Sequence, residues 1–346
     1  MGYLSNIPAS QQLATARQAE EGGVDDFWIA ESHYYRGAFS LAAQLASLTS
    51  RMRIGIGVVS PFSRHPAVTA MEAATVDEIS NGRFILGLGT SRRMMLGLGI
   101  AASPLIKGRV PRVSPIKAMK ESIEIIRRLF AGETVTFQGE IFRLQSPGAE
   151  APGVRLGLDV RRKIPIYIGA TGPKMLELTG SIADGVVFTL LTNPPFVRYA
   201  ISQIRKGAED ASRPSSDVRI VSYLLFSVSR NRRMALDSVR SLLALYITRV
   251  EPIVLEKAGL TQQEIARVET KVREEGIPAA MKLVDDEMVR RFAVAGTPDD
   301  CLERLAEYGE AGLETPVAMQ ILGPDPKEAV ELICSEILPE LRLGND

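Results

Sequence analysis

Three glycine-rich stretches have residue types that let a polypeptide backbone come close to a ligand. They are residues 55–61 (GIGVVSP), 83–89 (RFILGLG) and 169–173 (GATGP). The last one precedes a helical pattern, whose first-turn amides present N–H donors without partners inside the helix. Such donors favour an oxyanion or a phosphate, so this loop is a candidate phosphate grip. The alternative is an ordinary helix N-terminus hydrogen-bonded by water.

Apolar runs alternate with helical patterns along the chain, which predicts alternating strands and helices. The glycines stand at the ends of these predicted strands. Eight strands in such a series favour a closed (β/α)8 barrel over an open sheet. Ligands of these barrels bind over the C-terminal ends of the strands, where the glycines stand. We predict strands at 2–5, 26–30, 54–59, 84–89, 165–169, 186–189, 218–227 and 316–321, and helices at 8–21, 41–48, 67–79, 173–182, 196–209, 298–309 and 327–341.

Two longer segments interrupt the rhythm, at about 91–164 and about 230–292. The first contains a helical pattern near 117–130 and an alternating run, 135–144 (VTFQGEIFRL), that predicts a hairpin around Gln138-Gly139. The second is charged and periodic enough for several helices. Because α/β barrels run long as single domains, we predict one domain, 1–346, with these two insertions.

The chain carries 41 basic and 41 acidic residues, so its formal charge of zero gives no global attraction for nucleic acid or an anionic membrane. Between Glu78 and Glu121, however, every charged residue is basic. This segment either attracts an anionic ligand or is a solvated basic loop. Nucleic-acid binding is less expected, because no Phe, Tyr or Trp occurs from residue 85 to residue 129. The basic members of the segment are Arg83, Arg92, Arg93, Lys107, Arg109, Arg112, Lys117 and Lys120.

The cysteines and histidines narrow the chemistry further. Cys301 and Cys334 have no CxxC partner, which indicates free thiols and fits a reducing cytoplasm. The start, MGYLSNIPAS, has no signal-peptide pattern and no apolar run is long enough to span a membrane, so we expect neither export nor insertion. His33 and His65 are too few for a three-histidine zinc site, so we expect no metal. His65 precedes Pro66 at the start of a predicted helix, so we expect a capping or structural role for it rather than a catalytic one.

Three separated motifs, in the right order along the strands, resemble the bacterial luciferase-like superfamily of flavin and deazaflavin oxidoreductases. They are DFWIA with the following Glu31-Ser32-His33, the run from GIGVVSPFSRHP to RFILGLGTS, and IPIYIGATGPKMLELTGSIADGVVF. Within that superfamily they look most like the methylenetetrahydromethanopterin reductases that use coenzyme F420. The resemblance implies a barrel oxidoreductase that transfers a hydride between the deazaflavin and a small-molecule substrate.

The resemblance also assigns roles to residues. Hydride transfer requires a planar ring held by backbone on one face, and glycine permits that approach. In the similar enzymes a cis peptide forms a bulge behind the ring, at the position of Gly57-Val58 here, and the loop after the fifth strand holds the cofactor's phosphate. The expected cofactor contacts are Gly57, Val58, Ser60, Gly87, Gly89, Thr90, Gly169, Ala170, Thr171, Gly172 and Lys174, and the expected catalytic residues are Glu31, Ser32 and His33.

Two departures from the family pattern bear on the substrate. Many members have a histidine directly after the acidic residue of the second-strand motif, where this chain has Ser32. The sugar-phosphate dehydrogenases have an acidic residue where this chain has Arg92, which disfavours sugar oxidation. A cyclic methylene-pterin or folate-like substrate, reduced to its methyl form, fits better. Its amine nitrogen then needs a proton, from Glu31 or another carboxylate.

Other functions are compatible with the same residues. An FMN-dependent monooxygenase of the same superfamily is the first alternative, and a non-redox barrel acting on a phosphorylated metabolite is the second. A non-catalytic member that stores flavin is a third. The helices at 41–48 and 67–74 are rich in small residues that permit close helix packing, and similar proteins pair through this side, so we expect a homodimer.

Overall fold

The computed structural model describes the chain except for residues 5–6, 33, 92–113, 147, 149–152 and 344–346. Its contacts divide the chain into two compact units. Unit 1 comprises residues 1–4, 10–25 and 170–346, and unit 2 comprises residues 5–9 and 26–169. The expectation of one domain with two insertions stays a prediction.

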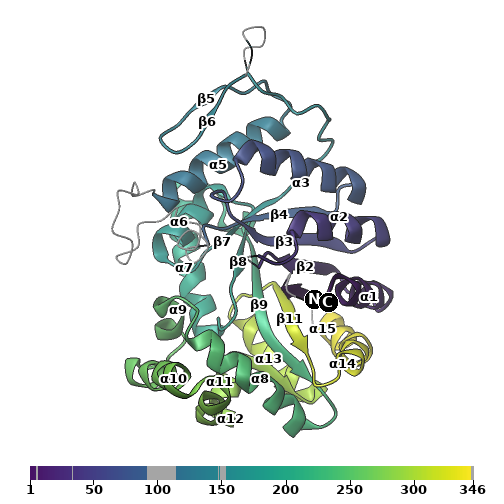
Figure 1. The fold of residues 1–346 in the computed structure, drawn as a ribbon, viewed down its shortest axis with the longest axis vertical. Helices are drawn as coiled ribbons and strands as arrows, with labels where there is room; N and C mark the ends of the chain where they lie inside the picture. Colours follow the sequence, from purple (N-terminus) through teal and green to yellow (C-terminus); the bar gives the residue numbers. More distant parts are fainter. Residues whose placement is uncertain (5–6, 33, 92–113, 147, 149–152, 344–346) are drawn as a thin grey trace. The chain divides into compact units, whose positions relative to one another are not determined.

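Unit 2 is built on four neighbouring parallel strands, β2 to β4 and β7. Helices α2 and α3 pack together and α3 packs on α5, and they flank the strands (Figure 1). The elements are β2 (Asp26–Ala30), α2 (Ala38–Leu48), β3 (Arg53–Val59), α3 (Pro66–Ser80), β4 (Phe84–Leu88), α5 (Pro115–Phe130), β5 (Phe137–Gln138), β6 (Arg143–Leu144) and β7 (Ile166–Gly169).

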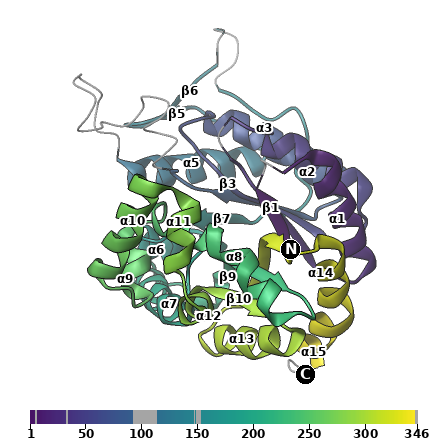
Figure 2. The ribbon, with the colours of Figure 1, turned by 60° about the horizontal axis from the view of Figure 1, so that its bottom comes forward.

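Unit 1 holds the remaining strands and most of the helices. The strands are β1 (Gly2–Leu4), β8 (Gly185–Phe188), β9 (Arg219–Val228), β10 (Ala293–Gly296) and β11 (Thr315–Leu322). The helices are α1 (Ala9–Glu21), α6 (Pro173–Ile182), α7 (Pro194–Asp210), α8 (Arg232–Ile247), α9 (Pro252–Lys257), α10 (Gln262–Glu275), α11 (Ile277–Ala280), α12 (Asp286–Phe292), α13 (Pro298–Glu310), α14 (Pro326–Leu332) and α15 (Leu338–Leu343). Helices α10 to α12 pack around α8 (Figure 2), so the segment 230–292 contains several helices, as its charged and periodic sequence predicts.

The strand order is that of a closed ring. It runs β1-β2-β3-β4-β7-β8-β9-β11 and returns from β11 to β1, and every pair with a described register in this ring is parallel. These eight strands among the described residues are the eight predicted ones, and the (β/α)8 barrel is confirmed. Strand β10, which pairs with the second half of β9, was not predicted.

Local sequence accounts for the boundaries of α3. The His65 ring accepts a hydrogen bond from the Ala67 N–H at 3.2 Å, and Pro66 occupies the first helical turn. At the other end Asn81 adopts the left-handed conformation with φ of 56°. The predicted capping role of His65 is therefore confirmed. Its second ring nitrogen, Nε2, lies 3.0 Å from the Arg143 carbonyl oxygen, which ties the hairpin to the start of α3.

The predicted hairpin is also present, and one carboxylate of α5 secures its turn. Glu121 accepts hydrogen bonds from the N–H groups of Glu140, Ile141 and Phe142 at 2.9, 3.0 and 2.9 Å. The antiparallel strands β5 and β6 pair Phe137 with Leu144. The turn amides would otherwise need water, so Glu121 fixes the insertion to the helix before it.

The chain's single tryptophan, Trp28, lies in the interior of unit 2. Trp28 on β2 is fully buried, and its ring lies 5.9 Å from the ring of Tyr167 on β7, measured between centroids. A Cβ at Gly55, the registered partner of Trp28 on β3, would lie 2.4 Å from the indole. Glycine at this strand position therefore makes room for the largest side chain.

Among the described helices, none combines the length and the apolarity needed to cross a bilayer.

Candidate functional site

The C-terminal half of β3 departs from a regular strand at the place predicted. The peptide bond between Gly57 and Val58 is cis, as expected from the resemblance. The register with β4 shifts here, because Ile56 pairs with Leu86 and Val59 pairs with Leu88. Three residues of β3 thus correspond to two of β4, which is the signature of a bulge.

The bulge brings Val58 against glycines from two neighbouring strands. A Cβ at Gly89, just after β4, would lie 2.2 Å from Val58 Cγ2, and a Cβ at Gly169, the end of β7, would lie 2.9 Å from Val58 Cγ1. At Gly87 the obstacle is the Ile56 carbonyl oxygen, 2.2 Å from an added Cβ. The C-terminal ends of β3, β4 and β7 therefore meet around Val58, and a side chain at any of these glycines would have to displace a neighbouring atom.

Ser60 and Thr90 continue the same two strand ends. The Ser60 hydroxyl is buried and lies 3.4 Å from the Thr90 carbonyl oxygen, to which it donates, while it accepts from the Phe62 N–H at 3.3 Å. The Gly89 N–H donates to the Val59 carbonyl at 2.9 Å. The predicted residues Gly57, Val58, Ser60, Gly87, Gly89, Thr90 and Gly169 therefore form one group in unit 2.

Glu31 follows β2 directly and is engaged in an ion pair. Its two carboxylate oxygens accept from Arg64 Nη1 and Nη2 at 2.9 and 2.8 Å, and its Oε1 also lies 3.5 Å from the Ala38 N–H at the start of α2. Ser32, the next residue, is half-buried. The third predicted catalytic residue, His33, lies outside the described residues.

The predicted phosphate grip is described within unit 1. Helix α6 begins at Pro173, after Gly172, which makes no side-chain cap. The Gly172 carbonyl accepts from the Met175 and Leu176 N–H groups at 3.1 and 3.0 Å. Among the described residues other than its two chain neighbours, no atom comes within 4 Å of a Cβ placed on Gly172. Ala170 is buried, Thr171 is half-buried and Lys174 is exposed. Within the described part of the chain, there is therefore open space at Gly172 beside the first-turn amides of α6, which are donors that suit an anion.

The basic segment is only partly described, since Arg92, Arg93, Lys107, Arg109 and Arg112 lie outside the described residues. Two members have structural partners. The Arg83 guanidinium donates to the carbonyl oxygens of Ala46, Thr49 and Met52, and Lys117 pairs with Glu140 at 2.6 Å.

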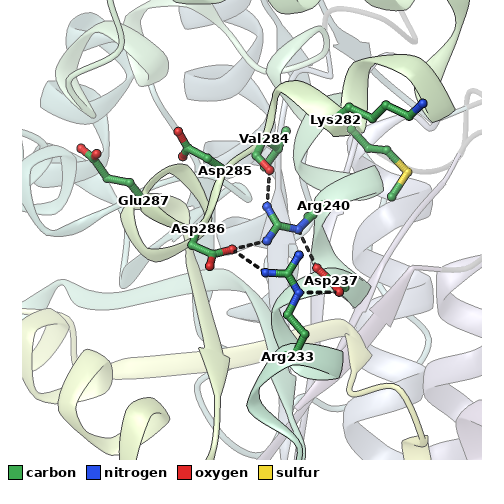
Figure 3. A pocket seen from close by; sticks show the side chains of 9 residues that line it. Arg233, Asp237, Arg240, Lys282, Val284, Asp285, Asp286 and Glu287 are labelled. Carbon is green, nitrogen blue, oxygen red and sulfur yellow. Dashed lines mark hydrogen bonds and ion pairs between the residues drawn. The ribbon is translucent and has the colours of Figure 1, made fainter.

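An open hollow of about 770 Å³ lies among α8, α12 and the turn before α12 in unit 1 (Figure 3). None of the predicted site residues lines it. Its floor is Arg240, whose guanidinium donates to the Val284 carbonyl and to Asp286 and Asp237. Arg233 pairs with the same two carboxylates. Because these charges satisfy one another, the cluster is a structural network that ties α8 to the start of α12.

A family model described as luciferase-like monooxygenase matches residues 1–315. The chain belongs to this family. Its fold closely resembles that of the coenzyme F420 dependent tetrahydromethanopterin reductase from Methanopyrus kandleri, with a TM-score of 0.87, 27% identity and 98% of each chain covered.

Two relatives match nearly the full chain. The 5,10-methylenetetrahydromethanopterin reductase of Archaeoglobus fulgidus is 34% identical over 329 residues, which cover 94% of this chain and 93% of that protein. The reductase of the same name from Methanolobus tindarius is 33% identical over 338 residues, covering 97% and 98%.

Sequence reasoning missed two residues at this site. Arg64 and Glu72 join Glu31 in one charged cluster, but they stand 33 and 41 positions after it. The only signal for Arg64 was its place in the loop after β3, directly before the helix-capping His65. Glu72 lies in a helical pattern that is equally compatible with a solvated face.

Proposed function

We propose that the protein is a coenzyme F420-dependent oxidoreductase that reduces a cyclic methylene-pterin, such as 5,10-methylenetetrahydromethanopterin, to the methyl form. The convergence of Gly89 and Gly169 on Val58, at the ends of three adjacent barrel strands, is the observation that carries this proposal. It supports a main-chain surface for a planar ring in the fold that the F420-dependent reductase of Methanopyrus kandleri shares. Near-full-length similarity to two reductases supports the choice of substrate.

The residues of this chain fit such a cofactor. Gly57, Val58, Gly87 and Gly89 would hold the ring face, with Ser60 and Thr90 at the strand ends beside it. The first-turn amides of α6 and the hydroxyl of Thr171, with Lys174, would hold the phosphate. When bound, the deazaflavin supplies the hydride. What the protein adds is placement and the exclusion of water between the reacting carbons.

The substrate's chemistry assigns a second task to the chain. When the methylene carbon becomes a methyl group, one carbon–nitrogen bond breaks and the released amine nitrogen takes up a proton. We assign the delivery of that proton to the segment Glu31 to His33, which follows β2.

Binding and turnover test this function together. The purified protein is mixed separately with F420 and with FMN, and affinity is measured by fluorescence quenching. Oxidation of reduced F420 is then followed with methylene-pterins, methylene-folate, alcohols and sugar phosphates. We expect F420 binding and turnover with a methylene-pterin. Tight FMN binding without an F420 response would favour the monooxygenase, and binding of neither would favour the phosphometabolite enzyme.

We also propose that the protein is a homodimer through α2 and α3. On α3 the apolar side chains Val68, Met71 and Ile79 are 44, 49 and 42% exposed and, with Thr75, form one stripe along the helix. Exposed apolar stripes of this kind are typical of interfaces. Light scattering at micromolar concentration should give twice the mass of the chain, and Met71→Glu should give the monomer. A monomeric wild type would contradict this proposal.

The cytoplasm is the proposed location, supported by the free thiols of Cys301 and Cys334. Cell fractionation followed by immunoblotting tests it.

A further inference from the structure

Two arginine–carboxylate pairs join β2 and β3 at opposite ends. At the first residues of the strands, Arg53 donates from Nε and Nη2 to Asp26 at 2.5 and 2.8 Å. Beyond the last residues, Arg64 donates from Nη1 and Nη2 to Glu31 at 2.9 and 2.8 Å. Both are two-pronged pairs, the geometry in which a guanidinium fixes a carboxylate most firmly.

The guanidinium of the second pair makes further contacts with α2 and α3. The Arg64 Nε lies 3.3 Å from Glu72 Oε2, and its guanidinium carbon lies 5.6 Å from the centre of the Phe39 ring. The side chains of Arg64 and Glu31 are 23% and 9% exposed, whereas that of Arg53 is 46% exposed. Arg64 therefore connects the end of β2, the start of α2 and the first turns of α3.

The cluster holds two carboxylates and one guanidinium. Pairing with Glu31 raises the pKa of Arg64, so this cation persists at every pH of interest. Burial raises the pKa of Glu72, and the neighbouring charge of Glu31 adds to the effect against the opposing influence of Arg64. Glu72 is therefore a carboxylate that takes up a proton more readily than an ordinary glutamate, while Arg64 grips Glu31 through its shorter contacts.

Register places this cluster level with the bulge. Ile29 on β2 is paired with Ile56 on β3, and two residues further along each strand stand Glu31 and Val58. The Asp26–Arg53 pair lies about five residues back, roughly 15 Å along the strands. One pair thus stands beside the candidate cofactor surface and the other at the far end of the same strands.

We propose that Arg64 is a positioning residue for the reaction: by clasping Glu31 it fixes the segment after β2 beside Gly57 and Val58. The inference rests on the proposed function, because the segment that begins at Glu31 is there assigned the delivery of the proton. Arg64 itself acts through Glu31 and needs no contact with the substrate.

The matched pair of arginines supplies the experiment. Arg64→Met, Arg64→Lys and the control Arg53→Met are compared with wild type in kcat, KM, F420 affinity by fluorescence quenching, and deuterium uptake by residues 34–38. We expect Arg64→Met to lower kcat about tenfold to a hundredfold with little change in F420 affinity, because misplacing a reacting group affects the chemical step. Deuterium uptake should rise in Arg64→Met alone.

The remaining variants separate positioning from simple stability. Arg64→Lys keeps the positive charge but cannot make the two-pronged contact with Glu31. Its kcat should therefore lie between those of Arg64→Met and wild type. Arg53→Met removes a two-pronged pair between the same strands, and its kcat should stay within about twofold of wild type because that pair lies at the far end of the strands from the candidate cofactor surface. Equal losses in Arg53→Met and Arg64→Met, or an unchanged kcat in Arg64→Met, would overturn the role of Arg64. A wild type without F420-linked turnover would instead overturn the proposed function.

Discussion

The contact between Gly89 and Val58 gives the sharpest quantitative test of the site's architecture. In Gly89→Ala the new Cβ would stand 2.2 Å from Val58 Cγ2. Non-bonded carbons prefer at least 3.5 Å, so the two strands must separate by about 1.3 Å or Val58 must leave its rotamer. Overpacking of this kind costs typically 1–3 kcal/mol, and we expect about 2 to 3 kcal/mol here because two strand ends resist movement.

A second substitution decides whether this contact is the cause. Val58→Ala removes both γ-methyl groups from a half-buried side chain and should cost about 1 kcal/mol by itself. In the double variant the obstacle is gone, so its total cost should be about 1 to 2 kcal/mol rather than the sum of about 3 to 4 kcal/mol. Gly87→Ala is the control, because its obstacle is the Ile56 carbonyl oxygen and Val58→Ala cannot relieve it.

The assay is urea unfolding followed by the fluorescence of Trp28, the only tryptophan of the chain, which lies buried in unit 2 with all of these residues. If the double variant Gly89→Ala, Val58→Ala loses as much unfolding free energy as the two single variants together, within about 0.5 kcal/mol, the reasoning is refuted. Additivity of that kind is the behaviour of independent sites. Rescue of Gly87→Ala by Val58→Ala would also refute the reasoning.

Three further predictions concern charges and thiols. Burial raises the pKa of Glu72 above its ordinary 4.5, so its favourable contribution is full below that pH and is lost as the pH rises through the folded-state pKa. The urea midpoint of Glu72→Gln minus that of wild type should therefore be larger at pH 7 than at pH 4.5. A smaller difference at pH 7 would contradict this prediction. Burial raises the pKa of Cys301 to about 12, so iodoacetamide at pH 8 should leave it unmodified in the folded protein by mass spectrometry and alkylate it in urea. Arg240→Ala leaves the buried Val284 carbonyl without its donor and should cost about 1–3 kcal/mol in urea unfolding, whereas Arg233→Ala, on the same carboxylates but exposed, should cost under about 1 kcal/mol; equal costs would contradict the network.

The barrel was predictable because most of its strands can be recognised from the local sequence, as apolar runs next to turn residues and helix caps. The apolar run 84–88 lies between Asn81-Gly82 and Gly89, and the run 26–30 comes shortly after Gly22-Gly23. The helix between 59 and 84 carries the terminal signals His65-Pro66 and Asn81-Gly82. Strand β10 was missed since its four residues, Ala-Val-Ala-Gly, are small and too few to show alternation. The helix predicted at 327–341 contains a π-helical stretch at Ile333–Ile337 that no residue pattern marks.

The candidate site was predictable only where backbone decides it. The positions of Gly57, Gly89 and Gly169 follow from strand order, because adjacent parallel strands bring their ends together. The clasp between Glu31 and Arg64 does not, since a long flexible arginine reaches many partners and only the folded loop selects one. The hydrogen bonds of Glu121 were not predictable either. A periodic pattern places Glu121 on a helix face, but it does not show that Glu121 accepts hydrogen bonds from the hairpin amides.

The pairing of the first strand with the last has a consequence for synthesis on the ribosome. Gly2 on β1 is registered with Met319 on β11, so β1 waits for about three hundred further residues before it finds its hydrogen-bonding neighbour on that side. At typical translation rates that wait is about 15 to 60 s. Strands β2, β3, β4 and β7, by contrast, all come from one continuous stretch, 26–169, and can assemble while the rest is still being translated. The edge of β1 that faces β11 thus stays unpaired during most of elongation, while β2, its neighbour on the other side, is made soon after it.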